Sequence, residues 1–134
     1  MSELEFTDSR QFVIWRWALR VLGETAVRNL PERGLRVAEE AIELGQAMGV
    51  DAADLHRLVD YVYSRPVGTP GQEIAGTMVT LYAAAAAVGV NADAAYEAEV
   101  ARIHTPEIED KVRRRQAEKR ERMIAAPVDS KGKP

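Results

Sequence analysis

The stretch RGLRVAEEAIEL, residues 33–44, is the segment around which the rest of the chain can be interpreted. At about 100° per residue, a helix gathers four of the charged residues of this stretch within about a third of its circumference. These residues are Arg36, Glu39, Glu40 and Glu43. The remaining side is apolar and consists of Leu35, Val37, Ala38, Ala41, Ile42 and Leu44. We expect a helix with one core face and one acidic face, and the crowded carboxylates are either a solvated surface or a cation site.

The composition indicates an ordinary soluble domain. With 134 residues, 46% of them apolar, the chain is long enough for one domain with a core and too short for two. We expect that domain to span residues 1–126, followed by a disordered tail at 127–134. The net charge of -3 gives no indication of a nucleic-acid partner. Residues 1–9 contain no apolar secretory segment, so we expect a cytoplasmic protein.

Several chemistries are excluded or disfavoured by residue type. The chain has no cysteine, which rules out disulfides, thiolate catalysis and thiolate metal sites. Its two histidines, His56 and His104, are too few for a His-rich zinc centre. We interpret His56 as a surface or boundary residue, because no acid or nucleophile accompanies it at a matching local spacing.

The spacing of apolar residues and helix-capping residues predicts an all-α protein, a bundle of about five to six helices. The helices are expected at about residues 8–29, 31–48, 51–64, 72–88, 91–103 and 105–123. Expected N-caps are Asp8 or Ser9, Asp51, Asn91 or Asp93, and Thr105. The first helix carries a core stripe, and so does the third; the stripes consist of Phe12, Trp15, Leu19, Leu22, and of Leu55, Leu58, Val59, Val62.

The segment at residues 74–92 contains no charged residue, which predicts a helix buried on all sides. Its alanine-rich composition supplies too little transfer free energy for a membrane span, so we expect no membrane partner. Glu73 opens this helix as a lone acid. It either sits in the first turn, where a negative charge favours the helix dipole, or needs a cationic partner or a metal.

The basic run at residues 113–122 is the only segment with a charge pattern that could attract nucleic acid. Glu118 and Glu121 interrupt it, and it lacks aromatic residues for base stacking. We therefore expect a solvated face and no nucleic-acid partner. No glycine-rich phosphate loop of the Walker or dinucleotide type is present.

The motif at residues 39–43, Glu-Glu-Ala-Ile-Glu, followed by a buried helix that opens with Glu73, resembles the MazG-type all-α nucleoside triphosphate pyrophosphohydrolases. The resemblance covers about residues 35–103. It implies that Glu40, Glu43 and Glu73 are metal ligands, with Glu39 beside them and Arg36 placed for a phosphate. It also implies a bundle completed by assembly into a homodimer or larger.

One position departs from the family pattern. The aspartate of the second family motif is Gly76 in this chain, and glycine supplies no oxygen. Either fewer metal ions bind, or another acid such as Asp60 substitutes, or hydrolysis is lost while the scaffold is kept.

The function implied by the resemblance is the Mg²⁺-dependent hydrolysis of a nucleoside triphosphate to a monophosphate and pyrophosphate, with Mn²⁺ as an alternative ion. Glu39 is the expected base for the attacking water. Arg36 is expected near the phosphates, and Arg102 and Lys111 are added on charge alone. The alternative is a catalytically impaired relative that binds nucleotides or a partner protein, and Gly76 favours it.

Overall fold

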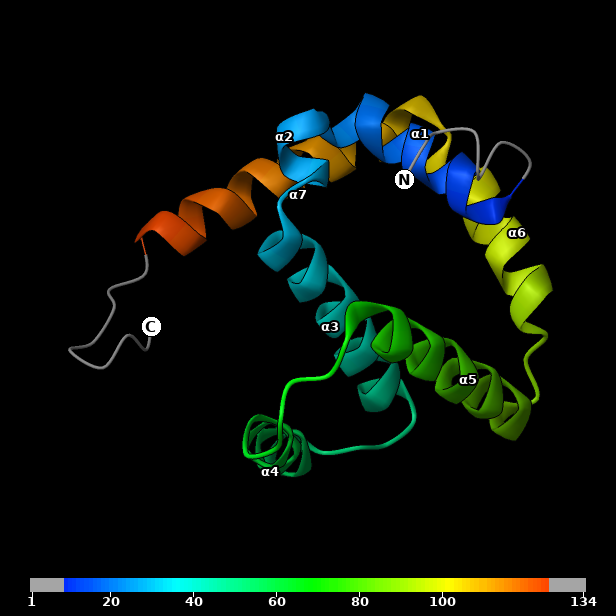
Figure 1. The fold of residues 1–134 in the computed structure, drawn as a ribbon. Helices are drawn as coiled ribbons and strands as arrows, with labels where there is room; N and C mark the ends of the chain where they lie inside the picture. Colours follow the sequence, from blue (N-terminus) through cyan, green and yellow to red (C-terminus); the bar gives the residue numbers. More distant parts are fainter. Residues whose placement is uncertain (1–8, 126–134) are drawn as a thin grey trace. The chain divides into compact units, whose positions relative to one another are not determined.

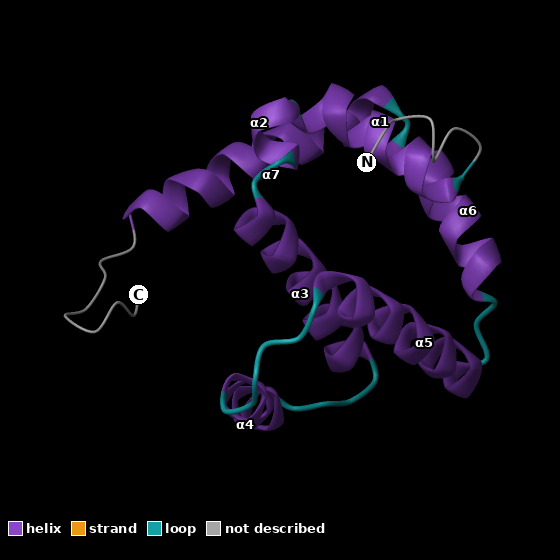
Figure 2. Cartoon of the chain, in the orientation of Figure 1, coloured by secondary structure: helices purple, strands orange, loops and turns teal. Residues whose placement is uncertain are grey.

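The computed structural model describes residues 9–125, which form helices joined by short loops (Figure 1). In chain order the helices are α1 (Arg10–Leu22), α2 (Glu24–Val27), α3 (Leu30–Ala47), α4 (Ala52–Tyr63), α5 (Pro70–Val88), α6 (Ala92–Ile103) and α7 (Pro106–Ala125). The described part of the chain contains no strand (Figure 2). The all-α prediction is confirmed. The predicted tail at 127–134 lies outside the described residues.

The chain divides into two compact units, which we describe separately. Unit 1 comprises Met1–Asn29 and Ala98–Pro134, and unit 2 comprises Leu30–Glu97. The expectation of a single domain over residues 1–126 stays a prediction.

Three of the seven described helices, α1, α4 and α6, begin at a side chain that caps them. The Ser9 hydroxyl accepts a hydrogen bond from the Phe12 amide at 3.1 Å, and the Asp51 carboxylate accepts one from the Asp54 amide at 2.8 Å. The Asn91 side chain accepts one from the amide of Ala94 at 2.9 Å. These contacts confirm the expected caps at Ser9, Asp51 and Asn91. Where two cap residues were considered, the cap of α1 is Ser9 and that of α6 is Asn91.

The first helix is shorter than predicted. A single helix was expected over residues 8–29, but α1 ends at Leu22 and the one-turn helix α2 follows. The break lies at Gly23, whose φ of 83° and ψ of 157° are accessible mainly to glycine. The periodicity did not reveal this break, because an isolated glycine is also tolerated inside helices.

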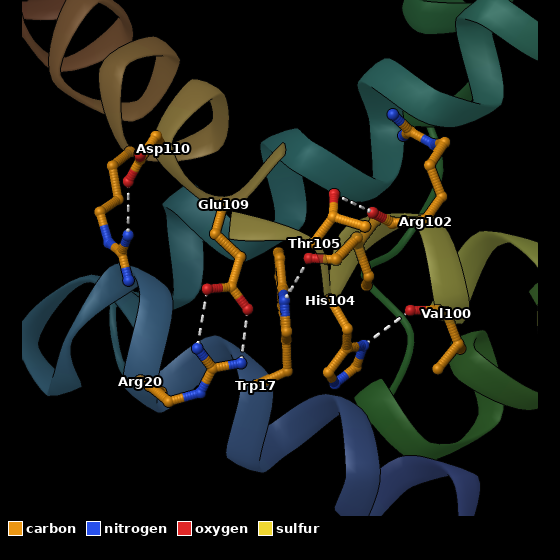
Figure 3. Close-up of polar contacts among 10 residues, drawn as sticks. Trp17, Arg20, Val100, Arg102, His104, Thr105, Glu109 and Asp110 are labelled. Atoms are coloured by element: carbon orange, nitrogen blue, oxygen red, sulfur yellow. Dashed lines mark hydrogen bonds and ion pairs between the residues drawn. The ribbon is translucent and has the colours of Figure 1, made fainter. Parts of the chain in front are cut away.

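Unit 1 has a small core formed where α1 packs against α2 and α7. Val21, Ala26 and Val27 are its buried apolar residues. The Trp17 indole donates a hydrogen bond of 2.9 Å to the carbonyl oxygen of Ile103, which ties α1 to the end of α6 (Figure 3). The expected stripe on α1 is only half-buried; its residues are Phe12, Trp15, Leu19 and Leu22.

Unit 2 departs most from the sequence-based expectations. The helices α3, α4 and α5 are well formed, but no two of them pack together along their lengths. The side of α3 predicted to face a core is therefore exposed, and so is most of the stripe on α4. The segment predicted to be buried, α5, is exposed along its length except at Ala84 and Ala85, which are half-buried. These core predictions are wrong for a single chain, because periodicity shows which face is apolar but not what covers it.

None of the described helices has, by itself, the length and apolarity needed to cross a membrane. The pair α5 and α6 passes that test only jointly, and the pair is bent by 103° at its break.

Candidate functional site

The acidic face of α3 (Glu39, Glu40 and Glu43) is a single helical surface, as predicted, because α3 runs without interruption from Leu30 to Ala47. Arg36 donates a hydrogen bond to the Glu39 carboxylate one turn away. Glu40 and Glu43 are exposed, and no described residue forms an ion pair with either of them. One acid of the face is thus paired with an arginine of its own helix, while the side chains of the other two are exposed to solvent.

Arg33 is a basic residue of this region that the motif comparison did not include. Its Nε and Nη2 atoms, and the Nε atom of Arg36, have almost no access to solvent and form no hydrogen bond. The nearest anion to Arg33 is the Glu32 carboxylate, at 3.4 Å from Nη2. Buried N–H donors without an acceptor are costly, and a phosphate oxygen is an acceptor that matches the guanidinium group. The three-residue spacing of Arg33 and Arg36 was the sequence signal for this pair.

Glu73 lies in the first turn of α5, where its side chain is folded against the preceding loop. A Cβ atom placed on Gly68 would lie 2.0 Å from Glu73 Oε1, so the carboxylate occupies the space that a side chain at Gly68 would need. The Glu73 carboxylate has no ion-pair partner among the described residues. Glu73 therefore lies where a negative charge favours the helix dipole, and its role as a metal ligand stays a prediction.

The surface beside Gly76 is open. A Cβ atom built on Gly76 would meet no atom within 4 Å, so an aspartate side chain could be accommodated there. Asp60, the acid considered as a substitute, lies on α4 and is exposed. Its carbonyl oxygen accepts a hydrogen bond from the Ser64 amide at 3.1 Å, which closes the end of that helix.

Arg102 and Lys111, assigned to phosphates on charge alone, belong to unit 1, whereas the acids belong to unit 2. Arg102 donates two hydrogen bonds to Glu99, of 2.8 and 2.5 Å, and these lower the pKa of that carboxyl. Lys111 is exposed on α7. Arg102 is therefore already engaged by an anion of its own helix, and only Lys111 is solvated.

The acids do not converge within the described chain. Among residues 9–125, no group of three or more His, Asp or Glu side chains is close enough to hold a metal ion. Carboxylate oxygens are the ligands that Mg²⁺ prefers, so the donor set fits the predicted ion. In a single chain, however, these carboxylates do not lie close enough together to form a site. The metal site of Glu40, Glu43, Glu73 and Asp60 therefore stays a prediction.

Comparison with known proteins assigns the chain to no family. No protein-family model matches it, and no curated protein or solved structure shows significant similarity. The fold defines an all-α protein.

Proposed function

We propose that the protein is a Mg²⁺-dependent pyrophosphohydrolase that cleaves nucleoside triphosphates to the monophosphate and pyrophosphate. The observation that carries this proposal is the juxtaposition of opposite charges on one helix. Two exposed carboxylates, Glu40 and Glu43, follow two guanidinium groups, those of Arg33 and Arg36. The Nε atom of each arginine is buried without a hydrogen-bond acceptor, whereas Arg36 also donates to Glu39 and Arg33 lies near Glu32. A polyanion with a bound divalent cation would satisfy both sets of groups.

Each part of this surface has a distinct role in the proposal. Arg33 and Arg36 bind phosphate oxygens, which compete with the Glu39 carboxylate for the Arg36 guanidinium. Substrate binding thereby releases Glu39 to take a proton from the attacking water. Glu40, Glu43, Glu73 and Asp60 would hold the cation, which would offset the negative charge of the phosphates when it is bound. Lys111 adds positive charge, and Arg102 does so only if it leaves Glu99.

The proposal is tested by incubating the purified protein with a panel of ribo- and deoxyribonucleoside triphosphates and Mg²⁺, and measuring released pyrophosphate. We expect release by the wild type and a loss of at least about 100-fold in Glu43→Gln, as is usual when a charged catalytic contact is removed. Glu118→Gln, which removes an exposed acid on α7, is the matched control and should keep full activity. No release above the Glu43→Gln background with any triphosphate would overturn the enzyme proposal.

A second candidate is a catalytically impaired relative that binds nucleotides without cleaving them. Gly76 favours it, because this position offers no side-chain oxygen where the similar family has an aspartate. Equilibrium dialysis with labelled nucleoside triphosphate and Mg²⁺ separates the two candidates. Binding that depends on Arg33 and Arg36, together with an absence of pyrophosphate release, supports the second candidate over the first.

A further inference from the structure

The contact between α1 and α7 in unit 1 leaves an open hollow of about 340 Å³, which the proposed function does not use. The described residues that line it come from the end of α1 and the middle of α7, and they are Val21, Leu22, Arg113, Gln116 and Ala117. Ligand sites in proteins start at roughly 300 Å³. The hollow therefore has room for a small organic molecule.

The α1 side of the hollow is apolar. Val21 belongs to the small core of unit 1 and is 5% exposed, and the neighbouring Leu22 is half-buried. Ala117 adds to this apolar surface from α7. An apolar group bound here is removed from water on the side that faces α1, and this favours binding in proportion to the area covered.

The α7 side of the hollow carries hydrogen-bond donors. Arg113 and Gln116 are three positions apart, so they lie on the same side of the helix. The Arg113 guanidinium donates from Nη1 to the Asp110 carboxylate at 3.0 Å, and Asp110 is its one hydrogen-bond partner among the described residues. The remaining N–H groups of Arg113 can therefore bind a second anion while this contact is kept.

Gln116 has an unmet hydrogen bond beside this hollow. Its Nε2 atom has almost no access to solvent and no acceptor, and a buried donor without an acceptor is costly. The last side-chain torsion of glutamine is soft, so the carboxamide turns at little cost and presents Nε2 to a ligand in the hollow. An acceptor bound next to Gln116 would complete the hydrogen bonding of this group.

The lining selects the chemistry of the ligand. No acid is among the described residues that line the hollow, so no carboxylate of the lining repels an anion. One guanidinium and one amide donor suit the two oxygens of a carboxylate. The apolar surface beside these donors favours an organic acid over inorganic phosphate or sulfate, because those ions have no apolar part to place there.

We propose that the hollow between α1 and α7 is a binding site for a small monocarboxylate with a short apolar chain. The carboxylate oxygens accept hydrogen bonds from Arg113 and Gln116, and the chain lies on Val21, Leu22 and Ala117. The ligand touches both helices, so its binding stabilises their contact. All the described lining belongs to unit 1, and binding needs neither nucleotide nor Mg²⁺, so this proposal is independent of the proposed function.

The probe is hexanoate, titrated into the isotope-labelled full chain at pH 7 without nucleotide or metal. Heteronuclear NMR follows the side-chain amide signal of Gln116, which is identified as the signal absent from Gln116→Glu. We expect a saturable shift with half-saturation at roughly 0.1–10 mM, the usual range for a ligand of this size. Acetate lacks the chain and hexanol lacks the charge, so each should bind at least about 10-fold more weakly. The absence of a saturable shift, or equal binding of hexanoate and either control compound, would overturn the proposal.

A matched pair of variants tests the guanidinium. Arg113→Gln and Arg114→Gln make the same change at adjacent exposed positions of α7, of which only Arg113 lines the hollow. We expect Arg113→Gln to weaken hexanoate binding at least about 10-fold, because a charge-assisted hydrogen bond is lost, and Arg114→Gln to bind as wild type. Both positions are exposed, so both variants should keep the wild-type circular dichroism spectrum. Equal affinities of the two variants for hexanoate would overturn the proposal.

Two further variants test the rest of the lining through a second measurement, the rise in melting temperature that hexanoate causes. Gln116→Glu replaces the amide donor by a carboxylate that repels the ligand, and Ala117→Leu fills part of the hollow with a larger side chain. The wild type should be stabilised by hexanoate, and both variants should lose this stabilisation. A rise of wild-type size in both variants would place the ligand elsewhere and contradict the proposal. Pyrophosphate release has no bearing on either measurement, so the two proposals fail separately.

Discussion

Arg20 on α1 and Glu109 on α7 form a bidentate ion pair that joins two distant parts of the chain (Figure 3). The guanidinium donates hydrogen bonds of 2.8 and 2.6 Å to the two carboxylate oxygens. Glu109 is one of the few buried residues of the described chain, whereas Arg20 is about half exposed. The pair therefore ties the end of α1 to the first turns of α7, with the carboxylate as its buried partner.

This ion pair predicts a specific acid sensitivity of unit 1. The hydrogen bonds from Arg20 hold the pKa of Glu109 below its usual value of 4.5. The ion pair therefore stabilises the folded protein fully at pH values above 4.5, and this stabilisation is lost as the pH falls through the lowered pKa. Glu109→Gln should lower the melting temperature at pH 7, and the difference from wild type should shrink below about pH 4. Thermal melts of the variant and the wild type, followed by circular dichroism at pH 7 and at pH 3, measure the difference in melting temperature.

The control for that experiment is Glu107→Gln, which removes an exposed acid from the same turn of α7. It should leave the melting temperature nearly unchanged at either pH. A difference between Glu109→Gln and wild type that stays constant from pH 7 to pH 3 would show that the ion pair is not its source.

The hydrogen bond of Trp17 leads us to expect that replacing Trp17 destabilises the protein more than replacing Trp15. Replacing Trp17 by Phe removes the hydrogen bond to the Ile103 carbonyl, which should cost about 1 kcal/mol in the free energy of unfolding. The control is Trp15→Phe. The Trp15 ring lies 5.4 Å from the Arg28 guanidinium, but its indole N–H has no hydrogen-bond partner among the described residues. Urea denaturation should show the larger loss for Trp17→Phe, and equal losses would contradict the prediction.

We expect substitution by alanine to have opposite effects on stability at Gly23 and at Gly34. Gly23 has a positive φ of 83°, so Gly23→Ala should destabilise the chain by roughly 1–2 kcal/mol. Gly34 lies inside α3, and an added Cβ would meet nothing within 4 Å. Gly34→Ala should therefore be stabilising by about 0.5–1 kcal/mol. Urea midpoints of both variants give the two signs, and a loss of stability in Gly34→Ala would show that α3 is closely covered at this point.

We expect that replacing Gly76 by aspartate raises the affinity of the protein for a divalent metal ion. Gly76→Asp adds a carboxylate where an added Cβ meets nothing within 4 Å, one turn after Glu73. We expect it to bind Mn²⁺ at least about 10-fold more tightly than wild type, because an added anionic ligand favours a hard cation. Gly76→Asn has nearly the same shape without the charge and serves as the control. Isothermal titration with Mn²⁺ measures both, and equal affinities would place the cation away from α5.

Contacts within one or two helical turns were predictable from the sequence. The caps at Ser9, Asp51 and Asn91, the helical course of residues 33–44 and the end of α5 at Gly89 depend on residues a few positions apart. The common side shared by Arg36 and the three glutamates follows from helical geometry once α3 forms. The break between α1 and α2 at Gly23 shows the limit of such reasoning, because a glycine is compatible with a continuous helix and with a break.

Contacts between helices were not predictable in this way. The pairs Arg20 with Glu109 and Trp17 with Ile103 join residues 89 and 86 positions apart, and no periodicity relates such distant positions. The apolar faces of α3, α4 and α5 were recognised from the sequence, but the expectation that the chain itself buries them was wrong. By itself, therefore, the sequence determined the helices and the charged and apolar faces that each presents, because these depend on local geometry. Only the tertiary structure decided which faces pack, because packing depends on surfaces brought together across the whole chain.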